Sequence, residues 1–129
     1  MSKRILMIDD CVEMCEEVSE ILRDEGYEVQ VAHDGVAGDA LLKGSCYDLV
    51  LLDLKMPGLD GFGVLRSLRQ RDDEIKVVIV TARPIVSDLL KTEGGLDDRD
   101  YETLKLADGV INKPYDLPLL LSTMRGLLG

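Results

Sequence analysis

The chain of 129 residues is poor in aromatic side chains: it has no tryptophan, one phenylalanine and four tyrosines, or 4% in total. Because 46% of its residues are still hydrophobic, a core can form without disulfides or a structural metal. That core must be built from aliphatic side chains and methionine. The length is close to the commonest domain size, so we expect one domain spanning residues 1–129.

Positive charge is also scarce, since 15 Lys and Arg residues stand against 25 Asp and Glu, a net charge of −10. Such a surface repels nucleic acid and anionic membranes, so neither is expected as a direct partner. No apolar run approaches the length of a membrane span, and no signal peptide precedes the first strand-like run. The odd number of cysteines, three, fits reduced thiols, and we expect a cytoplasmic protein.

Short runs rich in Val, Ile and Leu alternate with helical patterns along the whole chain. The apolar runs cover residues 4–8, 28–32, 48–53, 76–81 and 109–113. Helical spacing is found at residues 11–25, 36–43, 61–71 and 117–127, where Asp60 and Asp116 are candidate caps of the last two helices. This alternation predicts an α/β fold in which a parallel sheet has helices on both faces. The polarity of residues 28–32 alternates most, which favours an edge strand.

Charged and polar side chains follow four of the predicted strands. Asp9 and Asp10 end the first strand, Asp53 the third, Thr81 the fourth, and Lys113 the fifth. Ligands of open parallel sheets bind beyond the carboxyl ends of the strands, so these groups are expected to meet there. Two unit charges about 4 Å apart repel by roughly 4 kcal/mol at an effective dielectric near 20. A cation is therefore expected among the carboxylates, and oxygen-only ligands suit Mg²⁺.

Each of these residues also has an ordinary explanation when it is taken alone. Asp10 followed by Glu13 resembles a capping box at the start of the first helix. Asp53 precedes a loop and is typical of a turn. Thr81 is an ordinary β-branched strand residue, and Lys113 would be a solvated lysine. The placement of all of them at carboxyl ends favours the shared site.

The motifs that contain these residues resemble the receiver domain of two-component response regulators. They are MIDD (residues 7–10), DLVLLDLKMPGLDGFGVL (48–65), VVIVTA (77–82) and NKPY (112–115). The resemblance covers almost the whole chain. It implies a flavodoxin-like, doubly wound, five-stranded parallel sheet with strand order 2-1-3-4-5 and helices on both faces.

The resemblance also implies a role for each site residue. Asp53 would be the phosphoacceptor that attacks a phosphohistidine of a sensor histidine kinase or phosphotransfer protein. Thr81 would bind a phosphoryl oxygen, and Lys113 would pair with the phosphate. The implied Mg²⁺ ligands are Asp9, Asp10, Asp53 and the backbone carbonyl of Lys55. The bond between Lys113 and Pro114 would be cis.

A receiver domain would be a switch and not an enzyme with an external substrate, although it would catalyse its own dephosphorylation. Its further partners would be an output domain or downstream protein, and a phosphorylation-dependent homodimer through the 85–127 face is a reasonable hypothesis. The sequence ends just after the last predicted helix, which fits a stand-alone receiver or the first domain of a larger regulator.

Two features depart from the family pattern. Val110 occupies the position, three residues before Lys113, where the family usually carries Tyr or Phe, and Tyr115 is no obvious substitute. Thirty-one residues separate Thr81 from Lys113, more than the family leads one to expect, so we expect an irregular, extended region at residues 85–108. It is either a surface loop or a modified partner surface, and the loop is slightly favoured.

Two other functions use the same elements. A phosphatase of the haloacid-dehalogenase type also has an aspartyl nucleophile and Mg²⁺, but it places a D-x-D pattern after the first strand, where this chain has Asp9-Asp10. A flavin-binding carrier of the flavodoxin type would need a hydroxyl- and glycine-rich phosphate loop at that point. The acidic residues there disfavour it.

Overall fold

The computed structural model describes residues 2–54, 61–71, 74–81, 102–103, 105–113 and 115–129. Lys55, Asp60, Pro114 and most of the predicted extended region 85–108 lie outside this part of the chain, so the predictions made for them stay predictions. Within the described residues, no helix is long and apolar enough to cross a membrane.

Five parallel strands form one sheet in the order β2-β1-β3-β4-β5, as predicted. Their bounds are β1 Arg4–Ile8, β2 Glu28–Ala32, β3 Leu49–Asp53, β4 Lys76–Thr81 and β5 Gly109–Asn112. The three inner strands are almost wholly buried, as their continuous apolar sequences predict. The strand β2 alternates exposed and part-buried residues until Ala32, because it lies at an edge.

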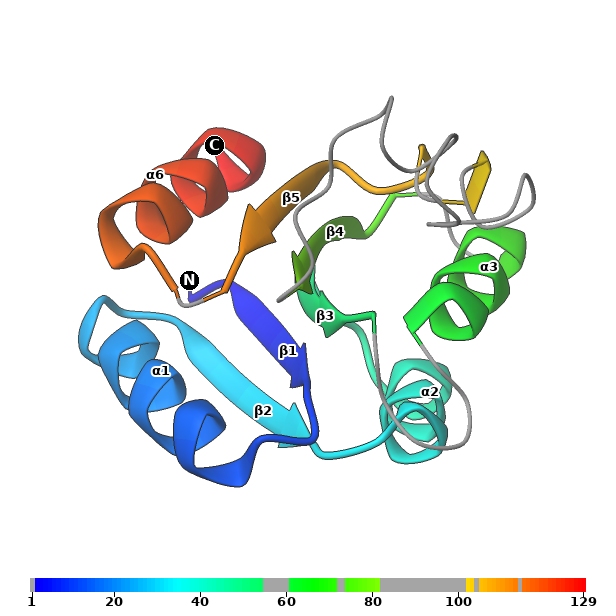
Figure 1. The fold of residues 1–129 in the computed structure, drawn as a ribbon, viewed down its shortest axis with the longest axis horizontal. Coiled ribbons are helices and arrows are strands. Elements are labelled where there is room, and N and C mark those ends of the chain that lie inside the picture. Colours follow the sequence, from blue (N-terminus) through cyan, green and yellow to red (C-terminus); the bar gives the residue numbers. More distant parts are fainter. Residues whose placement is uncertain (1, 55–60, 72–73, 82–101, 104, 114) are drawn as a thin grey trace.

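Four described helices pack on the two faces of the sheet. They are α1 Val12–Asp24, α2 Gly35–Gly44, α3 Gly61–Arg71 and α6 Leu117–Leu128. Figure 1 shows α1 and α6 on one face and α2 and α3 on the other. The predicted layers are therefore confirmed, and no end of a described element differs from its predicted position by more than one residue.

The alternation of side chains along each strand divides the core into two layers. On the α2/α3 face, Leu6, Val50 and Val77 pack with Leu42, Phe62 and Leu65. On the α1/α6 face, Met7, Leu51 and Val78 pack with Cys15, Leu22 and Met124. Aliphatic side chains and methionine supply nearly all of this core, as the scarcity of aromatics requires.

The helix ends confirm one predicted cap and correct another. The side chain of Asp116 accepts a hydrogen bond from the backbone N–H of Leu119 at 3.1 Å, at the start of α6. The interpretation of Asp10 as the cap of α1 is wrong, because Cys11 is the capping residue and no side-chain cap bond is formed. The carboxylate that binds this turn is Asp9, whose Oδ1 accepts from the N–H of Cys11 at 3.0 Å.

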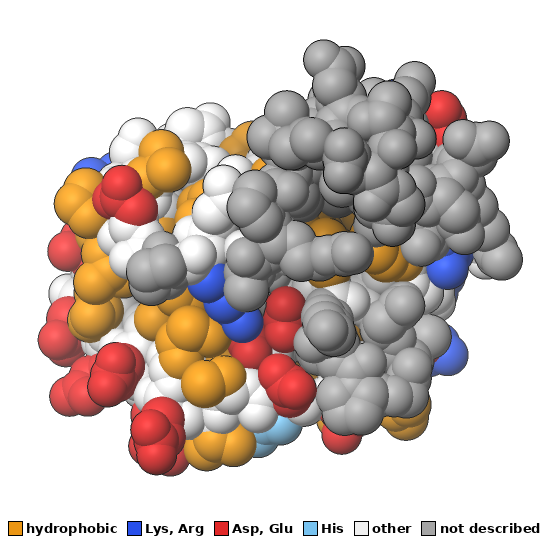
Figure 2. All heavy atoms as spheres, in the orientation of Figure 1, with side chains coloured by type: hydrophobic (Ala, Val, Ile, Leu, Met, Phe, Trp, Pro, Cys, Tyr) orange, Lys and Arg blue, Asp and Glu red, His pale blue; other side chains and the backbone are white. Residues whose placement is uncertain are grey.

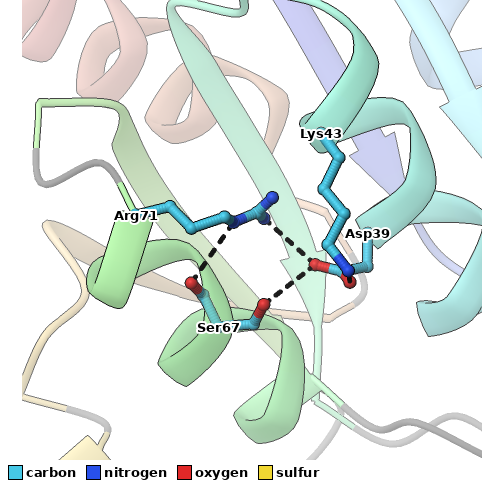
Figure 3. Close-up of polar contacts among 4 residues, drawn as sticks. All are labelled: Asp39, Lys43, Ser67 and Arg71. Atoms are coloured by element: carbon cyan, nitrogen blue, oxygen red, sulfur yellow. Dashed lines mark hydrogen bonds and ion pairs between the residues drawn. The ribbon is translucent and has the colours of Figure 1, made fainter.

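A polar cluster joins α2 to α3 on the far side of the sheet from α1 (Figure 3). Asp39 is only 8% exposed. Its Oδ1 accepts hydrogen bonds from Ser67 Oγ at 3.2 Å and from Arg71 Nη2 at 3.1 Å. Lys43, one turn further along α2, places its Nζ 3.0 Å from Oδ2 of Asp39. A buried carboxylate is stable here because donors from both helices surround it.

We expect Asp39→Ala to lower the free energy of unfolding by about 2 kcal/mol, because it leaves the Ser67 hydroxyl and the Arg71 guanidinium without their shared acceptor. The matched variant Lys43→Ala removes only the exposed ion pair, and it should cost less than about 0.5 kcal/mol. Urea unfolding of both variants measures the difference. Equal losses would show that Asp39 does not organise this helix pair.

Candidate functional site

Strand register brings the predicted site residues to one edge of the sheet. Ile8 of β1 pairs with Leu52 of β3, so Asp9 and Asp53 follow at the same level. Thr81 ends β4 and pairs with Asn112 of β5. Lys113 comes one residue later, and its backbone N–H donates to the carbonyl of Thr81 at 2.7 Å. These four strands therefore bring their polar residues to the same end of the sheet, as predicted from the sequence.

Asp9, Asp10 and Asp53 form one carboxylate cluster. Each offers an oxygen, and these oxygens all lie within 4.8 Å of one another. Asp9 and Asp53 are 2% and 6% exposed, whereas Asp10 is open to solvent. Two of the three negative charges are therefore held away from water, where their mutual repulsion is least screened.

Among the described residues, Lys113 places a positive charge inside this cluster. Its Nζ lies 2.7 Å from Oδ2 of Asp9 and 3.7 Å from Oδ2 of Asp53. Burial alone would lower the pKa of Lys113, but the bond to Asp9 and the negative charges of Asp9 and Asp53 outweigh it and raise that pKa. In Figure 2, Lys or Arg atoms meet Asp or Glu atoms near the middle of the face shown.

The backbone of Asp9 is fixed by residues that are not among the predicted site residues. Its N–H donates to the carbonyl of Ala32 at 3.0 Å. Its carbonyl oxygen lies 3.2 Å from Nδ1 of His33 and 3.6 Å from Sγ of Cys15. His33 directly follows β2, so the rule that selected Asp9 and Asp53 would have found it if it had been applied to the second strand.

The three carboxylates fit a divalent metal ion. With Lys113 protonated, the charges add to −3 + 1 = −2, which one dication would neutralise. Oδ2 of Asp9 is buried and has no well-aligned hydrogen-bond donor among the described residues, so it has lone pairs to offer besides its ion pair with Lys113. Hard carboxylate oxygens are the ligands that Mg²⁺ prefers.

Comparison with known proteins identifies the family. A family model described as the response regulator receiver domain matches residues 5–125. The chain belongs to this family. It is therefore a receiver domain of two-component response regulators, and its flavodoxin-like fold and strand order are as predicted. The phosphatase and flavin-carrier alternatives gain no support from this match.

Relatives and solved structures agree on the family. The receiver domain is 38% identical to the response regulator MprA of Mycobacterium bovis over 128 residues, which are 99% of this chain and 51% of MprA. It thus spans about half the length of the curated relatives it matches. The response regulator TrrA of Thermotoga maritima, solved with Mg²⁺-BeF, is 30% identical with a TM-score of 0.80, over 98% of this chain and 99% of that one.

Two further structures extend the comparison. TrrA has also been solved in complex with the histidine kinase ThkA, where it is 29% identical to this chain with a TM-score of 0.82, over 98% of this chain and 99% of that one. The chemotaxis protein CheY4 of Vibrio cholerae is 25% identical with a TM-score of 0.82, over 99% of this chain and 100% of that one.

We expect Asp10→Asn to raise the melting temperature of the receiver domain in metal-free buffer, because it removes one of three mutually repelling charges and no described hydrogen bond of that side chain. The gain should shrink in about 1 M salt, where the Debye length is about 3 Å. Glu13→Gln, which removes an exposed acid from the first turn of α1, is the matched control and should change little. Thermal unfolding of Asp10→Asn at or below the wild-type midpoint would contradict this electrostatic picture.

Stability should fall as the pH rises above about 8.5, where a thiol begins to ionise in the unfolded chain. Burial, followed by the negative charge of Asp9, raises the pKa of the Cys15 thiol to about 12 in the folded state. Above pH 8.5 the unfolded chain thus binds fewer protons than the folded one. The protonated Cys15 thiol therefore contributes fully to the free energy of unfolding below that pH, and its contribution is lost as the pH rises toward 12. Burial, and then the charge of Asp9, also raises the pKa of Tyr115.

Urea unfolding between pH 8 and pH 11 tests this expectation through its slope. Cys15→Ala should give a shallower loss of stability with pH than the wild type, whatever its absolute stability. Cys46→Ala removes an exposed thiol and should leave the slope unchanged. Parallel curves for the wild type and Cys15→Ala would show that this buried thiol does not govern the alkaline response.

Proposed function

We propose that this receiver domain accepts a phosphoryl group from a phosphohistidine onto Asp53 with the help of Mg²⁺. The donor would be a sensor histidine kinase or a phosphotransfer protein. The observation that carries the proposal is the arrangement of one buried carboxylate, Asp53, beside Asp9 and Asp10 and 3.7 Å from the ammonium of Lys113.

The chemistry follows from this charge arrangement. An oxygen of Asp53 attacks the phosphorus atom, the phosphorus–nitrogen bond breaks, and the imidazole of the donor leaves with the bonding electron pair. The negative charge that gathers on the phosphoryl oxygens is stabilised by Lys113, while the hydroxyl of Thr81 is the candidate donor to one of them. Asp9, Asp10 and Asp53, with the backbone carbonyl of Lys55 as the predicted further ligand, would hold Mg²⁺, which would supply the remaining charge neutralisation.

The product is an acyl phosphate, and water attacking its phosphorus atom would regenerate the carboxylate. The same cationic groups would stabilise that second step, so the domain would reset itself slowly. It would act as a cytoplasmic switch with autocatalytic activity only, and not as an enzyme that turns over an external substrate.

The surface beside α1 is suited to a protein that carries the phosphohistidine. An apolar hollow of about 260 Å³ there is lined by Met14, Glu17, Val18, Ile21, Tyr115 and Leu117. Glu17 is the acidic residue of this lining, and Figure 2 shows further acidic side chains on the α1 side of the molecule. The known complex of TrrA with ThkA supports a kinase partner for a related domain.

The phosphorylated state would change binding to an output domain, a downstream protein or a second copy of this chain. Val110, at the position where the family usually has an aromatic ring, is 40% exposed on the edge strand β5. Its short side chain offers no hydroxyl to follow Thr81, so the response of this face would differ from the usual aromatic one.

Incubation with acetyl phosphate, followed by intact mass measurement, tests the proposal. With Mg²⁺ we expect one phosphoryl group per chain, and with a chelator we expect none. Asp53→Asn should abolish the addition because it removes the nucleophilic oxygen. Asp24→Asn, which changes an exposed aspartate at the end of α1, should be phosphorylated like the wild type. Addition that survives Asp53→Asn, or that needs no divalent ion, would refute the assignment.

A further inference from the structure

One arginine of α3 joins three segments at the opposite end of the sheet from the carboxylates. All three nitrogens of the Arg69 guanidinium donate: Nη1 to the carbonyl of Ile75 at 2.7 Å, Nε to the carbonyl of Leu106 at 3.0 Å, and Nη2 to Oδ2 of Asp108 at 2.9 Å. Its side chain is only 12% exposed. Arg69 thereby fixes the start of β4 and the segment that enters β5 to the same helix. Figure 1 shows both at the end of the sheet that lies toward α3.

Asp108 passes this restraint on to the sheet. Its Oδ2 accepts from the backbone N–H of Val77 at 2.8 Å, and its own N–H donates to the carbonyl of Val77 at 2.7 Å. Asp108 therefore holds one residue of β4 through both its side chain and its backbone. The regular pairing begins immediately afterwards, with Val78 beside Gly109.

Within the described part of the chain, the strand β5 has few other contacts that hold its register. It is an edge strand of four residues, and Ile111 is the fully buried one among them, at 2% exposure. Val110 is 40% exposed, and Asn112 is also open to solvent. Strands with little buried apolar surface specify their register weakly, so a fixed point at one end matters more here than in β1 or β3.

The position of Lys113 depends on that register. Lys113 directly follows β5, and its Nζ must come within 2.7 Å of Asp9. A shift of one residue along β4 would move it by about 3.3 Å and turn its side chain to the other face. We propose that Arg69, acting through Asp108, is a positioning residue for Lys113. The restraint acts from a distance of roughly 16 Å, the length of five extended residues.

This inference rests on the proposed function, because Lys113 is assigned there to stabilise the phosphoryl group. The first test compares Arg69→Met with Arg71→Met in the full chain. Both substitutions remove a guanidinium from the end of α3, but Arg71 bonds to Asp39 of α2 and not to β5. With acetyl phosphate and Mg²⁺, we expect the phosphorylation rate of Arg69→Met to fall about tenfold, since even 1 Å of misplacement can cost up to 100-fold. Arg71→Met should change the rate less than about twofold, because it leaves the β5 register intact.

A double-mutant comparison separates positioning from general destabilisation. In a Lys113→Ala background, Arg69→Met should have little further effect on the rate, because the group that it positions is already missing. If Arg69→Met lowers the rate by the same factor in both backgrounds, its role is not exercised through Lys113. Asp108→Asn keeps an oxygen that can accept from the N–H of Val77, so its phosphorylation rate should fall less than that of Arg69→Met.

A second measurement does not depend on phosphorylation. The N–H of Lys113 is hydrogen-bonded to Thr81, so its hydrogen exchange reports whether β5 holds its place. Exchange at Lys113 should become faster in Arg69→Met and stay unchanged in Arg71→Met, and equal exchange in the two would overturn the inference. If the wild type is not phosphorylated at all, the proposed function fails. A phosphorylated wild type with equal rates in the two variants refutes the role of Arg69 alone.

Discussion

The repulsion among three carboxylates at one edge of the sheet is the constraint on which the rest of the site depends. At the effective dielectric of a protein surface, two such charges about 4 Å apart cost roughly 4 kcal/mol, which is a large part of the stability of a small domain. Asp9 and Asp53 cannot move apart, because they continue two paired strands whose residues are almost completely buried. The fold therefore imposes the repulsion, and a positive charge must offset it.

Lys113 offsets only part of that charge, which leaves a net −2 in a partly dry site. This remainder explains why a dication is the proposed ligand, and the bound dication would in turn allow a negatively charged phosphoryl group to approach Asp53. The positive charge belongs to Lys113, which directly follows β5, the shortest of the described strands. In the proposed scheme the contacts of Arg69 and Asp108 at the start of β5 therefore bear on the chemistry too, although they lie at the other end of the strand.

The strands and the site could be predicted from the sequence because both depend on local patterns. The bounds of β1, β2 and β4 follow directly from their apolar runs, and the end of each strand marked Asp9, Asp53, Thr81 and Lys113. The capping role predicted for Asp10 at the first helix is wrong, because the side chain of Asp9, one residue earlier, reaches forward and accepts from the N–H of Cys11. Periodicity cannot decide between two adjacent aspartates, since both are close enough to reach the first turn.

The long-range contacts were beyond such reasoning. Asp39 meets Arg71 across 32 residues, and Arg69 meets Asp108 across 39, so each pair exists only after the helices have packed on the sheet. In the sequence these residues are ordinary members of charged helix faces and loops. Which residues become their partners depends on how α3 packs against α2 and the sheet. That packing cannot be derived from any one segment of the sequence.

The most direct test of the account is a calorimetric titration of the receiver domain with Mg²⁺. The net −2 of the site predicts saturable binding of one ion per chain, with affinity reduced at least about tenfold by Asp53→Asn, since each lost carboxylate removes more than about 1.4 kcal/mol of attraction. Glu13→Gln, outside the cluster, should bind as the wild type does. Absence of saturable binding, or equal affinity in Asp53→Asn, would contradict the claim that these carboxylates form a metal site around Asp53.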